Sequence, residues 1–247
     1  MHLYIQLESP SGLEVPVHYN HIVQAVLYQT IDADLAKFLH DSGFVSQGRT
    51  FKLFCFSRLR GSFAKNGAAN NLIFRDKIQL VITSPVEEFC QSLANGLLKK
   101  GTLLFGRQPV EVKEIQVEQP RAEDEVTQLR TLSPIVAYST LLRPDGRKYT
   151  CYFQPGDPDY NSLITGNLRK KFQACYGREA PAGEVRVDKR GELRQNIIRY
   201  KETIIKGYSG RIRLTGPKEL LQMALDAGLG SKNSQGFGCV EMEKPRR

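Results

Sequence analysis

The sequence predicts an α+β fold built from two tandem ferredoxin-like (RRM-like, βαββαβ) domains. A chain of 247 residues with 40% hydrophobic residues is long enough for two small domains with packed cores. In the first half, segments with strand-like alternation and helix-like spacing follow one another as strand, helix, strand, strand, helix, strand. The same order recurs in the second half. Identity between the halves is too low to establish a repeat from the residues alone.

The first domain is expected in residues 1–122. Asn20 is a suitable N-cap for its first helix, and Asp32 for a short helix that ends near His40. The expected strands are residues 3–7, 51–57, 71–83 and 110–117, and the expected helices are residues 22–29, 35–40 and 85–98.

The polar segment 119–128 contains Pro120 and predicts a linker, so the second domain is expected in residues 129–247. Its first helix should carry a basic face made by Arg169-Lys170-Lys171. The expected strands are residues 132–139, 203–214 and 237–242, with a hairpin over 184–199, and the expected helices are residues 160–176 and 217–227.

Positive charge is concentrated in the second half of the chain. The formal charge is +9 and the pI about 9.3, yet residues 1–125 hold 13 Lys and Arg against 14 Asp and Glu. Residues 126–247 hold 22 against 12 and are expected to face a polyanion. No apolar run approaches the ~18 residues of a spanning helix, and no signal peptide is visible. These features favour nucleic acid over a membrane.

Cysteine and histidine patterns do not indicate a metal site or a cofactor. The five cysteines are widely spaced and form no Cys-x-x-Cys, which fits a reducing cytoplasm and argues against zinc. Of the four histidines only His18 and His21 have helical spacing, and no further ligands lie near them in the sequence. No acidic cluster resembles a two-metal nuclease site. A nuclease built from this chain is expected to work without metal.

A glycine-rich segment near the C-terminus reads Gly228-Leu-Gly-Ser-Lys232-Asn-Ser-Gln-Gly236-Phe-Gly238. Paired glycines allow positive φ and close approach of a phosphate chain. A dinucleotide fingerprint would need a glycine at Asn233, and a Walker loop would need Lys after Gly236, so neither motif is present. The alternative is a helix C-cap at Gly228 followed by a tight turn, which accounts for two of the four glycines.

The segment resembles the glycine-rich loop of the RAMP superfamily, in particular of its CRISPR repeat-processing endoribonucleases. Three further motifs match that family in order and approximate spacing, and the resemblance extends from Leu3 to Glu241. They are Ala25-Val-Leu-Tyr-Gln, Phe38-Leu-His-Asp and Lys52-Leu-Phe-Cys-Phe-Ser. The resemblance implies that Tyr28, His40 and Lys52 are catalytic. It also implies cleavage of precursor CRISPR RNA by 2′-OH attack, giving a 2′,3′-cyclic phosphate and a 5′-OH.

The chemistry of the three residues agrees with this role. Histidine transfers protons near neutrality, and a helix C-terminus favours its protonated form, so His40 suits a general acid. Lys52 can hold negative charge on a phosphate. Tyr28, with an ordinary pKa near ~10, suits orientation of the 2′-OH. Simpler roles stay open: a helix-end surface histidine, a tyrosine packed beside the core, and a lysine at a strand edge.

The expected partner is CRISPR repeat RNA. Contacts are expected from the loop residues Gly228, Gly230, Ser231, Lys232, Asn233, Ser234, Gly236 and Gly238, and from Arg58, Arg60, Arg190 and Arg194. Effector-complex subunits and a second copy of the chain are further partners that the sequence leaves open. Two alternatives remain: a non-cleaving guide-RNA-binding subunit of the superfamily, and an RRM-like module stacking bases on Phe51, Phe54 or Phe56.

Overall fold

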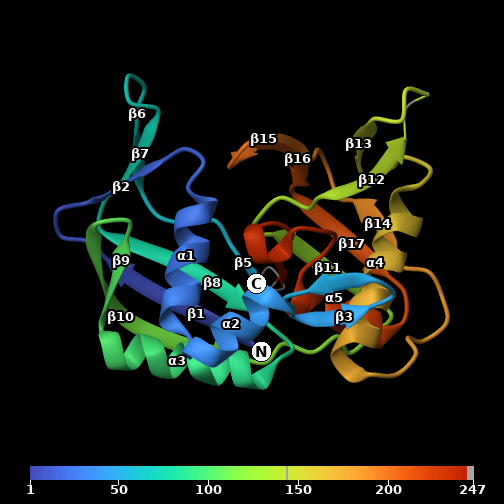
Figure 1. Cartoon of the computed structure of the whole chain (residues 1–247), viewed down its shortest axis with the longest axis horizontal. Coiled ribbons are helices and arrows are strands. Elements are labelled where there is room, and N and C mark those ends of the chain that lie inside the picture. Colours follow the sequence, from blue (N-terminus) through green and yellow to red (C-terminus); the bar gives the residue numbers. More distant parts are fainter. Residues whose placement is uncertain (143, 244–247) are drawn as a thin grey trace.

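The computed structural model describes residues 1–142 and 144–243. The chain forms two halves that lie side by side, each with an antiparallel sheet and helices packed on it (Figure 1). Both halves have the ferredoxin-like arrangement, which confirms the predicted fold class.

The N-terminal half contains a five-stranded sheet in the order β5-β8-β1-β10-β9. Its strands are β1 (His2–Glu8), β5 (Cys55–Phe56), β8 (Lys77–Thr83), β9 (Thr102–Phe105) and β10 (Gln108–Glu118). Its helices are α1 (Asn20–Thr30), α2 (Ala33–Asp41) and α3 (Glu87–Lys100). The first and third strands of the βαββαβ unit, β1 and β8, are central neighbours. The extra strand β9 extends the edge next to β10.

Alternation along β1 explains why helices cover one face of this sheet. Leu3, Ile5 and Leu7 are buried in a core shared with Val23 and Leu27 of α1 and with apolar residues of α3. Tyr4, between two of these residues, points to the opposite face and packs on a cluster that includes residues of the C-terminal half.

The C-terminal half contains a four-stranded sheet in the order β14-β17-β11-β18. Its strands are β11 (Val126–Thr131), β14 (Arg186–Lys189), β17 (Arg211–Thr215) and β18 (Val240–Met242). Its helices are α4 (Tyr160–Tyr176) and α5 (Lys218–Ala227). Apolar residues of both helices share one buried core with Leu129, Ile212 and Leu214 of the sheet.

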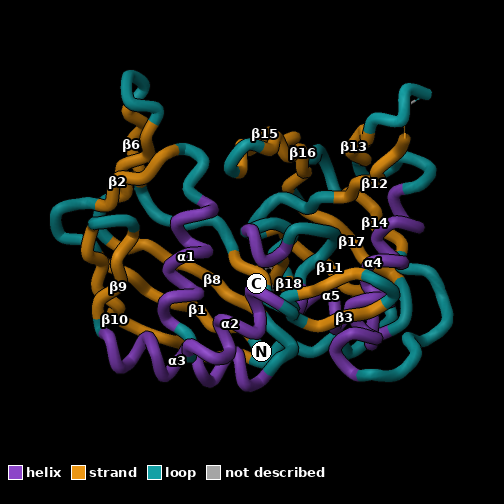
Figure 2. Tube along the Cα trace, viewed as in Figure 1, coloured by secondary structure: helices purple, strands orange, loops and turns teal. Residues whose placement is uncertain are grey.

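Among the described residues, short strands form four small sheets outside the two main ones (Figure 2). They are β2 (Leu13–Pro16), β6 (Phe63–Asn66) and β7 (Asn71–Phe74) in one sheet, and the hairpins β3 (Phe44–Ser46) with β4 (Arg49–Phe51), β12 (Ala137–Leu142) with β13 (Lys148–Phe153), and β15 (Arg194–Tyr200) with β16 (Thr203–Ser209). In Figure 1 the β6–β7, β15–β16 and β12–β13 hairpins rise from the same side of the molecule.

Several strands expected from the sequence are divided in the structure. The segment 51–57 is not one strand, because Leu53 takes a positive φ of 53° between β4 and β5. The segment 71–83 is split between β7 and β8 at Asp76, whose φ is 61°. At Leu53 the apolar run continues through the break, because Leu53 is buried in the C-terminal core and Phe54 in the N-terminal one. At Asp76 the break falls in the polar segment Arg75-Asp76-Lys77.

Several elements of the C-terminal half also differ from those expected. The expected strand 132–139 is wrong, because β11 precedes it and β12 begins only at Ala137. The expected hairpin over 184–199 is also wrong: β14 pairs with β17, and β15 pairs with β16. The long strand 203–214 breaks at Gly210, and the last strand begins at Val240 instead of Phe237. The domain limits at 122 and 129 stay a prediction.

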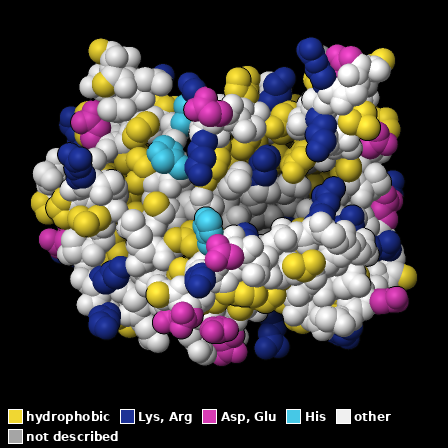
Figure 3. Space-filling model, in the orientation of Figure 1, with side chains coloured by type: hydrophobic (Ala, Val, Ile, Leu, Met, Phe, Trp, Pro, Cys, Tyr) yellow, Lys and Arg dark blue, Asp and Glu magenta, His cyan; other side chains and the backbone are white. Residues whose placement is uncertain are grey.

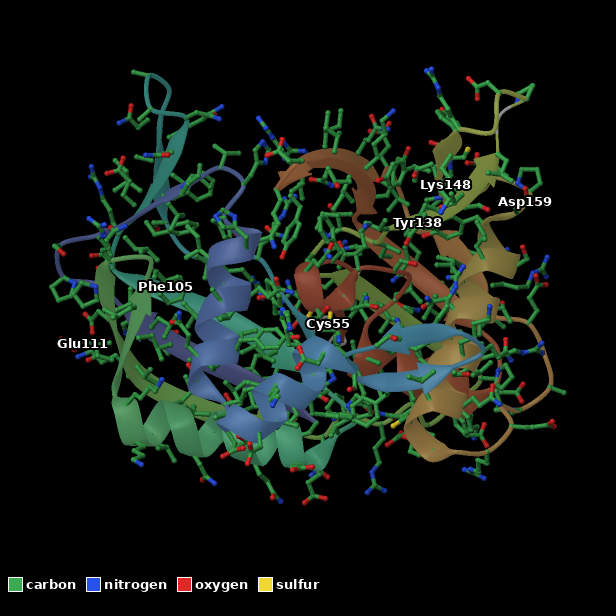
Figure 4. All side chains as sticks on the ribbon, in the orientation of Figure 1. Cys55, Phe105, Glu111, Tyr138, Lys148 and Asp159 are labelled. Atoms are coloured by element: carbon green, nitrogen blue, oxygen red, sulfur yellow. The ribbon has the colours of Figure 1, made fainter. Side chains whose placement is uncertain are left out.

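The two halves meet through a small buried cluster made of Cys55, Val81, Leu132 and Cys239. Figure 4 shows Cys55 near the middle of the molecule. Burial raises the pKa of the Cys239 thiol well above its ordinary value, and Cys55 beside it adds to this effect. The cluster fixes β5 against the segment that leads into β18.

Candidate functional site

His40 lies one residue before the end of α2, with its side chain 81% exposed. Its Nδ1 lies 2.8 Å from Oδ1 of Asp41, so Nδ1 carries the proton that this carboxylate accepts. The second nitrogen, Nε2, has no polar partner among residues 1–142 and 144–243 and is open to a ligand. Asp41 therefore orients a histidine that can exchange a proton at Nε2.

Lys52 is brought to the same place by the short β3–β4 hairpin. Its Nζ donates a hydrogen bond to the backbone oxygen of His40 at 3.0 Å. Burial lowers the pKa of Lys52, and the carboxylate of Asp41 partly opposes this. The end of α2 thus brings together a histidine, a carboxylate and an ammonium group.

Tyr28 lies on α1 and is half-buried, with its ring edge against Phe54 at 5.9 Å between centroids. Burial, with a smaller contribution from Tyr200, raises its pKa to about 12. The phenol therefore keeps its proton near neutrality and can act as a hydrogen-bond donor. The structure joins His40 and Lys52 directly. Tyr28 contacts Phe54, two residues after Lys52, and packs on the core that contains Leu39 of α2.

The break between α1 and α2 is made as the sequence predicted. Oδ1 of Asp32 accepts hydrogen bonds from the backbone N–H groups of Asp34 and Leu35, which caps α2. The predicted cap of α1 is wrong, because the N-cap residue is Tyr19 and it makes no side-chain cap. The side chain of Asn20 has a different role, at the glycine loop.

The glycine loop (residues 228–238) is folded tightly against the rest of the chain. All four of its glycines have positive φ, between 73° and 84°. A Cβ atom at Gly236 would lie 2.5 Å from the ring of Phe56, and one at Gly228 would lie 2.8 Å from Sγ of Cys55. At Gly230 and Gly238 it would collide with backbone oxygens of the chain itself. Internal packing thus accounts for all four glycines, where a cap and a turn accounted for two.

Side chains from α1 and β5 hold the glycine loop from the N-terminal half. Asn20 donates to the backbone oxygens of Gln235 at 2.8 Å and of Gly236 at 3.3 Å. Gln24 donates to the oxygen of Ser234 at 2.7 Å, and the Cys55 thiol to that of Phe237 at 3.1 Å. The loop therefore belongs to the interface between the halves and is positioned by both.

Lys171 is a buried structural residue, so the basic face predicted for Arg169-Lys170-Lys171 is wrong at this position. It is only 2% exposed, and its Nζ donates to the backbone oxygens of Gly228 at 2.6 Å and Gly230 at 2.8 Å. Burial lowers its pKa to about 7. A signal was present in the sequence: Lys171 continues the buried helical face of Ile164 and Leu168.

Four residues of the loop remain partly accessible: Ser231, Lys232, Ser234 and Gln235. Lys232 has a positive φ of 63°, and its Nζ lies 5.3 Å from the ring centroid of Tyr138. Burial lowers its pKa. No carboxylate lies within ion-pair distance of Lys232 in the described part of the chain. Contact between this accessible part and RNA stays a prediction.

The four arginines expected at the RNA fall into two groups. Arg60 lies 3.7 Å from Glu241, and Arg190 lies 2.6 Å from Glu243, so each has a carboxylate partner. Arg58 and Arg194 have none among the described residues, and Arg58 donates to Asn196 at 2.9 Å instead. Figure 3 shows Lys and Arg side chains around the middle of one face and over the C-terminal half.

The described residues contain no group of three or more His, Cys, Asp or Glu side chains that could hold a metal ion. All five cysteines are free. Within residues 1–142 and 144–243, none of the helices combines the length and the apolar character needed to cross a membrane.

Each half of the chain matches a protein-family model. The model of CRISPR associated protein Cas6, C-terminal, matches residues 117–242, and that of the Cas6 N-terminal region matches residues 14–116. The chain belongs to the Cas6 family. CRISPR-associated endoribonuclease Cas6 1 of Methanocaldococcus jannaschii is 27% identical to it over 248 residues, which cover 97% of this chain and 92% of the relative. CRISPR-associated endoribonuclease Cas6 of Pyrococcus furiosus is 26% identical over 240 residues, which cover 94% and 85%.

Solved structures of Cas6 proteins share the fold. One described as CRISPR associated protein Cas6 superposes with a TM-score of 0.78 at 24% identity and covers 99% of both chains. A Cas6-related protein from Pyrococcus furiosus gives a TM-score of 0.84 at 20% identity and covers 100% of this chain and 99% of its own. At these levels of sequence identity, the structural similarity shows that the chain shares the double ferredoxin-like fold.

Proposed function

We propose that this Cas6-family chain is an endoribonuclease that binds CRISPR repeat RNA and cleaves precursor CRISPR RNA. The observation that carries the proposal is the junction of His40 and Lys52 at the end of α2, with Nε2 of His40 open. Relatives from two organisms that match nearly the whole chain are named CRISPR-associated endoribonucleases, which supports the same activity.

The proposed reaction is attack of a 2′-OH on the adjacent phosphate. The 2′ oxygen bonds to phosphorus, the bond to the 5′ oxygen breaks, and the products are a 2′,3′-cyclic phosphate and a 5′-OH. In this scheme His40, with Asp41 on Nδ1, gives the Nε2 proton to the departing 5′ oxygen. Water accepts the proton that leaves the 2′-OH.

Lys52 and Tyr28 would act on the phosphate and the nucleophile. An ammonium group has three N–H donors, and the His40 carbonyl takes one, so two can reach phosphate oxygens. Tyr28 stays protonated because its pKa is raised to about 12, so it can donate a hydrogen bond that orients the reacting groups. It does not suit the role of general base. Since Lys52 supplies positive charge and His40 supplies a proton, we propose a reaction without metal.

RNA would approach from the accessible part of the glycine loop. Lys232 there has no carboxylate partner in the described structure, and the excess of basic residues lies in residues 126–247. We expect the protein to work in the cytoplasm, where its five free thiols are stable.

The second candidate is a non-cleaving subunit that holds guide RNA inside an effector complex. The loop and the unpaired arginines would serve such a protein equally well, whereas the open His40 beside Lys52 favours cleavage. An RRM-like stacking module is less favoured, because Phe54 and Phe56 are each only 1% exposed and form core. Partner subunits and homodimer formation stay predictions.

End-labelled CRISPR repeat RNA from the source genome, incubated in excess EDTA, tests the proposal. We expect one cut per repeat, a product with a 2′,3′-cyclic phosphate, and no cut when the scissile nucleotide carries a 2′-deoxy sugar. Binding without cleavage would favour the non-cleaving subunit. Cleavage only after magnesium is restored, with the RNA fold controlled, would contradict the metal-free mechanism.

A further inference from the structure

A cleft between the two halves is lined by residues other than His40 and Lys52. Its volume is about 300 Å³, which lies at the lower end of ligand pockets. Residues near the start of α1 and on β6 and β7 line one side of this cleft, and residues 194–198 of β15 line the other. None of the three catalytic candidates borders it. The cleft therefore requires its own explanation.

Two arginines from different halves face this cleft without an acid. Arg58 and Arg194 both line it, and no carboxylate of the described residues lies within ion-pair distance of either. Burial lowers the pKa of Arg58, Tyr19 partly opposes this, and the nearby charge of Arg194 lowers the pKa by a smaller amount. Arg58 is partly buried and Arg194 is exposed, and two like charges near each other are less unfavourable when an anion lies between them. The pair therefore indicates an anionic ligand.

Asn196 orients one member of the pair. Its Oδ1 accepts from Nη2 of Arg58 at 2.9 Å, and its Nδ2 donates to the backbone oxygen of Arg194 at 2.9 Å. A guanidinium has five N–H donors, so Arg58 keeps donors for a phosphate. The buried amide of Asn196 thus holds the Arg58 guanidinium beside the backbone of Arg194 and leaves Arg58 with donors for an anion.

The rim of the cleft adds an exposed aromatic surface. Phe63 on β6 is 57% exposed, and its ring lies against Phe74 at 5.4 Å between centroids. Opposite it, Ile197 of β15 is 58% exposed. A base can stack on an aromatic face whatever its identity, and two arginines suit the attached phosphate. Together these features match a nucleotide better than a bare anion.

We propose that this cleft binds one unstacked nucleotide of the RNA, with its base on Phe63 and its phosphate between Arg58 and Arg194. The proposal rests on the proposed function, since it assumes that the chain binds RNA. It adds a recognition site that is separate from the bond that is cut.

The cleft is connected to the glycine loop and to the active site through α1. Asn20 lines the cleft, and the same side chain holds the loop at Gln235 and Gly236. From Tyr19 to Tyr28 the helix rises ~13 Å, at ~1.5 Å per residue. A stacked strand advances ~3.4 Å per nucleotide, so the bound nucleotide lies several positions from the scissile phosphate. Its loss should weaken binding and leave the chemistry intact.

The test is a scan of repeat RNA from the source genome in which each nucleotide in turn is made abasic. Binding is measured for the wild type, Phe63→Ala, Phe63→Trp and Arg199→Ala. Arg199 is the control, because it lies on β15 outside the cleft and pairs with Glu202. We expect one position at which base removal weakens wild-type binding by about 5- to 100-fold. In the Phe63→Ala protein, removing the base at that position should weaken binding by less than about 2-fold, because the stacking partner is already gone.

Phe63→Trp and Arg199→Ala should keep the wild-type profile. Arg194→Ala should weaken binding of every RNA and reduce the slope of log affinity against log salt by about 1. The control Arg199→Ala should also cut bound RNA at the wild-type single-turnover rate. Identical abasic profiles for the wild type and Phe63→Ala would overturn the cleft proposal while RNA binding stands. Failure of the wild type to bind repeat RNA would overturn this inference and the proposed function together.

Discussion

Replacing His40 by Ala should stop cleavage while leaving the fold and RNA binding intact. General acid catalysis contributes a factor of about 10² to 10⁴, equal to ~3–5 kcal/mol of activation free energy. The side chain is 81% exposed, and its only polar partner among the described residues is Asp41. Truncating so exposed a group should change the free energy of unfolding by less than ~0.5 kcal/mol. The rate effect should therefore far exceed the stability effect.

Single-turnover cleavage at saturating protein measures this rate without a contribution from affinity. His21→Ala is the matched control, because His21 is another exposed histidine, on α1, whose Nδ1 lies 3.1 Å from the backbone oxygen of His18. The control should cut at the wild-type rate, and both variants should bind repeat RNA with wild-type affinity.

Asp41→Asn tests the orientation of the ring. Asp41 acts on His40 through Nδ1, so its loss should slow cleavage less than loss of the imidazole itself and should alter the pH profile of the rate. A folded His40→Ala protein that cuts as fast as the wild type would refute the argument. His40 would then be an ordinary residue at a helix end.

Three further predictions concern the glycine loop. Lys232→Ala should weaken RNA binding and reduce the salt slope by about 1 without changing the rate of bound RNA, whereas Lys218→Ala on the exposed start of α5 should change neither. Gly236→Val should lower the free energy of unfolding by ~2–4 kcal/mol in urea titrations, because a β-branched residue would need positive φ and would overlap a core ring. Lys171→Met should remove a pH dependence: with a folded pKa of about 7 and an ordinary value of 10.5, the unfolded chain holds a proton that the folded chain lacks. Wild-type stability should therefore rise between these pH values, by at most ~1.4 kcal/mol per pH unit. Lys170→Met should keep this rise, and an equal rise in the Lys171→Met protein would contradict the assignment.

The order of elements could be predicted from the sequence because each half follows local periodicity. Helix α4 was predicted with its observed limits, and β1 within one residue at each end. The breaks could not be predicted in the same way. Leu53 lies in an unbroken apolar run, yet it is buried in the C-terminal core while Phe54 is buried in the N-terminal one. Only the packing of two cores against each other requires that turn.

Part of the candidate site depends on contacts between distant segments. The join of Lys52 to His40 spans twelve residues, and it agrees with motifs recognisable in the sequence. Arg58 and Arg194 line the same cleft although they are 136 positions apart, and no local sequence pattern predicts this proximity. Asn20 looked like a helix cap because its side chain suits that role. In the folded chain its side-chain amide instead donates a hydrogen bond to a backbone oxygen more than 200 residues away.

One stripe of α1 contacts the glycine loop and also carries the proposed catalytic residue Tyr28. Asn20, Gln24 and Tyr28 recur every four residues, so they share a helix face, while Val23 and Leu27 enter the N-terminal core. Asn20 and Gln24 hold the glycine loop, Gln24 also accepts from the hydroxyl of Tyr200, and Tyr200 contributes to the raised pKa of Tyr28. Because α1 and the loop come from opposite ends of the chain, neither half alone positions both. The RNA-binding surface should therefore form only when the two halves are packed together, and mutations along this stripe should affect binding and cleavage jointly.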